Sequence, residues 1–123
     1  MASINEKNKG ENTLGDNIRI GNVGEIFAAE MLKIKGYEIL IMNYRNKLGE
    51  IDIIAQKNMV LTFVEVKTRQ SIKMGYPCEA VNHEKRRKIK KTALAFICEN
   101  KIKYQEIEFQ VIEIFVNQIK EAF

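Results

Sequence analysis

The stretch that decides the fold covers residues 60–69 and reads VLTFVEVKTR. Its first five residues form a mostly apolar strand, yet Glu65 and Lys67 follow with no turn residue before them. Charged side chains are depleted from strands and are almost never fully buried unless they are paired. Because side chains alternate along a strand, Glu65 and Lys67 share a face with Leu61 and Phe63. The end of this strand is therefore a candidate site.

Two other strand-like segments precede this stretch, at residues 37–43 and 50–55, and short polar connections separate the three. Short connections predict an antiparallel meander. Alternation in the middle segment divides its side chains between two faces, with Glu50, Asp52 and Ile54 against Ile51, Ile53 and Ala55. As hairpin neighbours, these strands would bring Asp52, Glu65 and Lys67 together at one end of the sheet.

Helices are predicted at residues 16–35 and 82–100 from apolar residues at helical spacing, and Gly36 supplies the stop of the first. The first helix is apolar on two sides. One side carries Val23, Ile26, Phe27, Met31 and Ile34, and the other carries Ala28, Ala29 and Leu32. This predicts that the helix packs on more than one face. The inner stripe predicted for the second helix consists of Ile89, Ala93, Phe96 and Ile97.

A last strand is predicted at residues 107–116, with apolar residues on both of its faces. The long helical connection before it predicts parallel pairing with the strand at 60–69. The element order is thus αβββαβ. It predicts an α/β fold with a mixed central sheet that is flanked by helices on both faces.

The length of 123 residues fits one domain, which we assign to residues 16–123 behind a loose polar tail at 1–15. No apolar run approaches the roughly 20 residues that a membrane helix needs, and no secretory signal is visible. Cys78 and Cys98 lack metal-ligand spacing. We therefore expect no membrane association and a reducing, cytoplasmic setting.

The chemistry expected at the site comes from carboxylates and lysines. The chain has one histidine and no glycine-rich phosphate loop, whereas a net charge of +4 suits a polyanionic partner. Asp52 and Glu65 would supply the one or two carboxylates that Mg²⁺ usually takes in proteins. Lys67 would orient an attacking water or offset charge, and Glu25 on the first helix would bind a second ion or fix waters. These four are the candidate catalytic residues for metal-assisted phosphodiester hydrolysis.

Asp52, a gap of 12 residues and then Glu65-Val66-Lys67 resembles the PD-(D/E)XK motif of restriction-endonuclease-like nucleases. Several further blocks look like the YraN-like family of small candidate endonucleases, over about residues 20–115. These blocks are Gly24-Glu25, Asn43-Tyr44-Arg45, Gly49-Glu50-Ile51-Asp52-Ile53-Ile54-Ala55, Phe63-Val64-Glu65-Val66-Lys67-Thr68-Arg69 and Pro77-Cys78-Glu79-Ala80-Val81.

This resemblance implies a restriction-endonuclease-like αβββαβ core, similar to archaeal Holliday-junction resolvases. It also implies cleavage of DNA, including branched or junction DNA, that depends on Mg²⁺ or Mn²⁺. The residues implicated are Asp52, Glu65 and Lys67, with Glu25 as the helical acid. The last strand departs from the family pattern, because Glu108-Phe109-Gln110 stands where an aspartate usually follows the phenylalanine.

Basic residues suggest where a nucleic acid would bind. Lys85-Arg86-Arg87-Lys88 and then Lys90-Lys91 cover more than one helical face and repel each other without an anion. The segment contains no aromatic residue, which favours phosphate contacts over base stacking. Arg45 and Arg69 flank the acidic site and would either reach phosphates or form salt bridges. The candidate nucleic-acid-binding residues are Arg45, Arg69, Lys85, Arg86, Arg87 and Lys90.

Two other functions fit the same sequence. A catalytically inactive nucleic-acid-binding module would keep the fold and the basic surface, and a protein-interaction domain would use the basic helix to meet an acidic partner. Closely placed carboxylates at Asp52 and Glu65 would favour the enzyme. A two-fold homodimer would suit the cutting of two strands, but this rests on analogy with the fold and leaves the oligomeric state open.

Overall fold

The computed structural model describes residues 13–69 and 82–122, with side chains of the first helix from Asn22 onward. The elements are α2 (Thr13–Ile34), β1 (Glu38–Asn46), β2 (Gly49–Lys57), β3 (Val60–Arg69), α3 (His83–Asn100) and β4 (Glu106–Phe115). The predicted αβββαβ order is confirmed. The first helix begins at Thr13 and so includes the end of the expected tail, whereas residues 1–12 lie outside the described part. None of the described helices is long and apolar enough to span a membrane.

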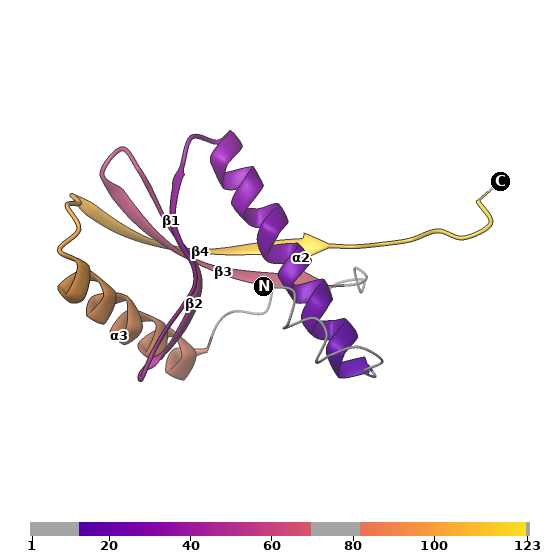
Figure 1. The fold of residues 1–123 in the computed structure, drawn as a ribbon, viewed down its shortest axis with the longest axis horizontal. Helices are drawn as coiled ribbons and strands as arrows, with labels where there is room; N and C mark the ends of the chain where they lie inside the picture. The colour runs from indigo at the N-terminus through magenta and orange to yellow at the C-terminus, as the bar shows by residue number, and fades with distance from the viewer. Residues whose placement is uncertain (1–12, 70–81, 123) are drawn as a thin grey trace, which may run out of the picture.

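The sheet has the order β1-β2-β3-β4. The first three strands pair antiparallel, and β4 pairs parallel to β3 along its length, from Val60 beside Glu106 to Arg69 beside Phe115. As Figure 1 shows, α2 and α3 lie on opposite sides of this sheet. The predicted mixed sheet with a helix on each face is therefore confirmed.

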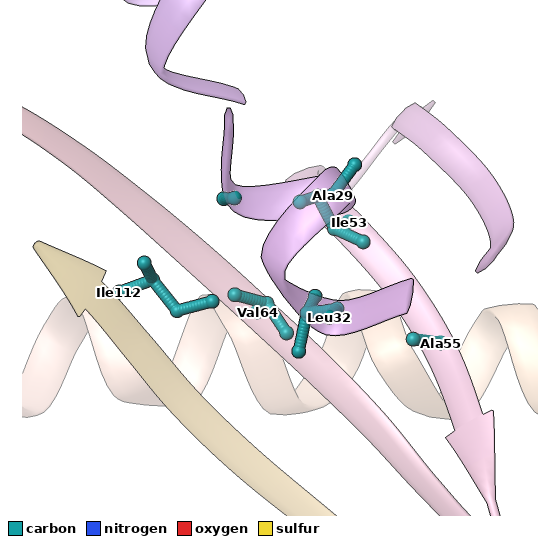
Figure 2. Close-up of a cluster of buried hydrophobic side chains, with 7 residues drawn as sticks. Ala29, Leu32, Ile53, Ala55, Val64 and Ile112 are labelled. Atoms are coloured by element: carbon teal, nitrogen blue, oxygen red, sulfur yellow. The ribbon is translucent and has the colours of Figure 1, made fainter. Parts of the chain in front are cut away.

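One layer of the core lies between α2 and the sheet. Ala28, Ala29 and Leu32 of the helix pack on Ile53, Ala55, Val64 and Ile112 (Figure 2). Small alanines let the helix lie close to the strands. The prediction that α2 packs on more than one face is wrong for the side chains described, because the other stripe is exposed: Val23, Ile26, Phe27, Met31 and Ile34.

The second core layer lies between α3 and the sheet. Ala93 and Phe96 are buried there, and Ile89 and Ile97 pack against the same cluster, as the sequence predicted. The helix begins after Asn82, whose side-chain oxygen accepts a hydrogen bond of 2.8 Å from the Lys85 backbone N–H. Helix α3 does not fully cover β4, because four apolar residues of this strand are each between 37% and 44% exposed: Ile107, Phe109, Val111 and Phe115.

Gly24 sets how closely α2 approaches β3. A Cβ at this position would overlap the Thr68 hydroxyl and lie 3.2 Å from the Thr68 Cβ. We expect Gly24→Ala to destabilise the fold by about 1–3 kcal/mol, because this contact leaves no room for a methyl group. In an open helix the same change stabilises by up to about 1 kcal/mol.

Urea unfolding of Gly24→Ala, with Gly24→Ala/Thr68→Ala as the matched double variant, tests this close approach. The double variant removes the hydroxyl that the new methyl group would meet, so it should recover part of the loss. A gain in stability for the single variant would contradict the contact.

Candidate metal and phosphate site

The site forms where β2 and β3 part. Their paired register ends at Ile53 and Val64, so Asp52 and Glu65 lie just beyond the ladder. Asp52 Oδ2 instead accepts a hydrogen bond of 2.7 Å from the Val66 backbone N–H. The carboxylate therefore bridges the gap between the two strands and is held at one oxygen.

The alternation predicted for β2 is wrong at Ile51. This side chain packs with Ile54 in the layer beneath α3, whereas Ile53 packs beneath α2. The irregularity coincides with the end of the β2–β3 ladder and with a left-handed residue in β1, Asn43, which has φ 56° and lies across from Asp52. The backbone thus leaves regular strand geometry at the site.

The Glu65 side chain is largely buried, with only 17% of its surface exposed. Its Oε1 lies 2.7 Å from Lys85 Nζ, on the first turn of α3. Its Oε2 is buried and has no hydrogen-bond partner among the described residues. Buried polar atoms without a partner are rare and costly, and a buried carboxylate oxygen is best satisfied by a donor or a cation.

The acids around Asp52 perturb one another. Burial raises the pKa of Asp52 and so does the nearby Glu65 carboxylate, while the hydrogen bond from Val66 and the Lys85 ammonium lower it. Burial and then the Asp52 charge raise the pKa of Glu25, which a hydrogen bond with the Asn43 side chain lowers. The structure thus brings Glu25, Asp52 and Glu65 into electrostatic contact from α2, β2 and β3.

A cleft of about 1060 Å³ opens over Asp52 and Glu65. One wall is α3, which contributes Lys85, Arg86, Lys88 and Lys90, and the other is β4, which contributes Phe109, Gln110 and Val111. The cleft thus combines carboxylates, which are the ligands that Mg²⁺ prefers, with cations of the kind that contact phosphates.

Three of the other predicted residues lie apart from this floor. Lys67 is half-buried two residues beyond Glu65 and does not line the cleft. Arg45 pairs with Glu50 at 2.9 Å on the surface, and Arg69 pairs with Glu113 at 2.8 Å. Both arginines therefore form the salt bridges that the sequence left as an alternative to phosphate contacts.

The basic run on α3 divides between two roles. Lys85 turns to Glu65, whereas Arg86, Arg87 and Lys90 are exposed and together line a shallow hollow of about 360 Å³ beside His83 and Glu84. Arg86 and Lys90 also line the cleft. The exposed cations Arg86, Lys88 and Lys90, which line the cleft, and Arg87, which lines only the hollow, are together called the basic wall below.

Sequence reasoning placed Lys85 in the phosphate-binding patch and missed its contact with the acidic site. It also missed Phe109, which reaches the cleft from β4. The missing information is spatial, because only the packing of α3 on β2 and the parallel pairing of β4 with β3 bring these residues to the same cleft.

The donor set fits a hard divalent cation such as Mg²⁺ or Mn²⁺. Carboxylate oxygens are the ligands these ions prefer, and Mg²⁺ usually takes only one or two of them. In the described residues, no three acidic, histidine or cysteine side chains are grouped to hold a metal ion by themselves. Asp52 and Glu65, with its unpartnered oxygen, would form the carboxylate pair, and Glu25 lies beside Asp52.

The fold and the site define a small α/β protein in which an acidic group lies where two strands part, beside a basic helix. The sequence profile of the Uncharacterised protein family UPF0102 matches residues 24–114. The chain therefore belongs to the UPF0102 family, and the family membership expected from the sequence motifs is confirmed.

Named relatives from several bacteria agree with this assignment. The chain is 49% identical to a UPF0102 protein of Caldicellulosiruptor saccharolyticus over 98 residues, which cover 80% of this chain and 83% of the relative. It is 46% identical to a UPF0102 protein of Clostridioides difficile over 108 residues, which cover 84% and 95%. A relative from Alkaliphilus oremlandii is 44% identical over 116 residues, which cover 87% and 99%.

Proposed function

We propose that this protein is a metal-dependent endonuclease of the PD-(D/E)XK type that hydrolyses phosphodiester bonds of DNA, including branched or junction DNA. The observation that carries the proposal is the buried, unpartnered Oε2 of Glu65 beside Asp52, at the floor of a cleft with a basic wall. Buried carboxylate oxygens are usually satisfied by a partner, and a divalent cation would satisfy this one.

The roles of the residues follow from their positions. Asp52 and Glu65 would hold Mg²⁺ or Mn²⁺, and Glu25 would fix water or a second ion beside Asp52. A bound divalent ion lowers the pKa of a coordinated water and polarises the phosphate. The basic wall would hold the phosphates on either side of the cut. Lys67 does not line the cleft, so its proposed role, to orient the attacking water or offset negative charge, is carried by the sequence motif and not by its position.

A binding module without nuclease activity is the second candidate. The observation that favours it is the Lys85 ammonium at Glu65 Oε1, because a protein cation already neutralises part of the acidic floor. The enzyme and the module differ in whether a divalent ion binds at this floor.

A Mn²⁺ titration by calorimetry distinguishes the two candidates. We expect the wild type to bind Mn²⁺ and Glu65→Gln to lose most of this affinity, because the amide removes a ligand charge. Lys85→Met should bind Mn²⁺ up to about five-fold more tightly, because it removes an ammonium that competes for Glu65, at the strength of a partly exposed ion pair.

Lys91→Met is the matched control for the lysine variant. Lys91 is an exposed lysine of the same helix that does not line the cleft, so its loss should leave Mn²⁺ affinity unchanged. Equal Mn²⁺ affinity in the wild type and Glu65→Gln would refute the metal site and favour the module.

A further inference from the structure

Phe109 presents an aromatic ring to the cleft. On one side it stacks against Phe63, with ring centroids 5.5 Å apart and an interplanar angle of 26°. Phe63 is buried and meets Phe96 edge to face at 6.2 Å, so Phe109 rests on the core. The residue is nevertheless 43% exposed and lines the cleft. Phe109 is therefore a supported ring, meaning one that is held by Phe63 and still exposes apolar surface in the cleft.

The same cleft also carries positive charge. Arg86, Lys88 and Lys90 line the cleft from α3, while Phe109 and Val111 line it from β4. A ligand that satisfies both walls must carry anionic groups and a flat apolar face. A nucleotide has both, since its phosphate suits the cations and its base suits the ring.

Base pairing decides which nucleic acid can use this ring. In a duplex, the faces of the bases are stacked on one another, so a protein ring reaches them only after a base is unstacked. A single-stranded segment exposes its bases, and stacking of one base on an aromatic side chain is sequence-tolerant because every base has a π-face. The supported ring therefore favours a strand with unpaired bases.

We propose that Phe109 is a stacking platform for an unpaired base, while Arg86, Lys88 and Lys90 hold the phosphates of the same strand. This inference rests on the proposed action on nucleic acid, and it adds the substrate class: DNA with a single-stranded segment. The platform escaped the sequence analysis because the aromatic ring comes from β4 and the cations come from α3.

Binding by Phe109→Leu and Phe109→Ala, each compared with the wild type, tests the platform. The probes are a 12-nucleotide single strand containing 2-aminopurine and a duplex of the same sequence, both with EDTA present to prevent cleavage. We expect a roughly ten-fold or greater loss of single-strand affinity in both variants, the effect of one base–aromatic stack. Duplex affinity should change little, and quenching of 2-aminopurine should disappear. Leucine keeps apolar contact with Phe63, so this variant still tests stacking if alanine unfolds the protein.

Phe115→Leu is the matched control, because Phe115 is 44% exposed on the same strand and does not line the cleft. It should bind both probes as the wild type does. Unchanged single-strand affinity in Phe109→Leu would overturn the platform and leave the proposed nuclease intact. If Phe109→Leu changed the sedimentation coefficient of the protein but not its single-strand affinity, the platform would also be overturned. Phe109 would then belong to a contact between subunits. Failure of the wild type to bind either probe would overturn both proposals.

Discussion

DNA cleavage is expected to fall by about 10³-fold or more in Asp52→Asn and in Glu65→Gln. Each change keeps the size of the side chain and removes one charge that would hold the divalent ion. The ion contributes several kcal/mol of transition-state stabilisation, and every 1.4 kcal/mol is a factor of ten in rate. Single-turnover cleavage of a labelled substrate in Mn²⁺ measures the effect.

The thermal stability of the metal-free Asp52→Asn variant can be predicted from the pKa of Asp52. Because burial raises this pKa above its value in the unfolded chain, the stability that the carboxyl group contributes is present at low pH and is lost as the pH rises through the folded pKa. At neutral pH the raised pKa of Asp52 therefore opposes folding. Asn removes this penalty and can still accept the hydrogen bond from Val66, so the metal-free variant should melt no lower than the wild type.

Glu99→Gln is the matched control for these changes, because Glu99 is an exposed acid near the end of α3. It should cleave at the wild-type rate. If Asp52→Asn or Glu65→Gln also cleaves at the wild-type rate, the acidic floor is not the metal site.

The second large effect is expected for DNA binding by Arg86→Ala/Arg87→Ala/Lys90→Ala. Each phosphate contact that is lost should flatten the slope of log K against log salt by about 0.9 on duplex DNA. Affinity should fall alike for all sequences, because phosphate contacts do not read bases. Mn²⁺ affinity should stay unchanged, because Lys85 and the acidic floor are intact in this variant.

A second triple variant controls for net charge. Lys35→Ala/Lys103→Ala/Lys120→Ala removes three exposed cations from outside α3. If the basic wall binds phosphate locally, this control should keep most of the affinity and slope. Equal losses of DNA affinity in the two triple variants would show that binding depends on overall charge. No loss of DNA affinity in either variant would show that the basic wall is only a solvated helix face.

The element order and the acidic group could be predicted because local patterns determine them. The charges that interrupt residues 60–69 located the end of β3, and hairpin pairing brought Asp52 beside Glu65. The structure agrees, since Asp52 is in electrostatic contact with Glu65 and accepts a hydrogen bond from Val66. Short connections carried enough information for this pairing, although the period of two failed at Ile51.

The remaining errors have physical causes that lie outside a single segment. The Ile51 side chain lies on the α3 side of the sheet, where the β2–β3 ladder has ended. A regular alternation of side chains does not predict this irregularity. Helix α2 packs on the sheet through its alanine face, which lets it approach the strands closely. Phe27 and Ile34 on the exposed stripe are larger and more apolar. Apolar periodicity alone cannot choose between two such faces.

Lys85 illustrates a limit in predicting the site. In the sequence it is one cation among six in 85–91, and nothing distinguishes it from Lys88. The structure separates them, because Asn82 caps α3 and the first turn of the helix meets β3 at Glu65. Which lysine meets the acid depends on how α3 packs against the sheet, and this rotation and offset are tertiary properties.

The most direct test of the central claim is metal-dependent cleavage by the wild-type protein. Labelled duplex, single-stranded, flap and four-way junction DNA would be incubated with the protein in Mg²⁺, Mn²⁺ or EDTA, with Glu65→Gln in parallel. The account predicts cleavage of at least one of these substrates with Mg²⁺ or Mn²⁺, none in EDTA, and none above background for Glu65→Gln. Binding of DNA and Mn²⁺ without cleavage of any substrate would contradict it, as would equal cleavage in EDTA.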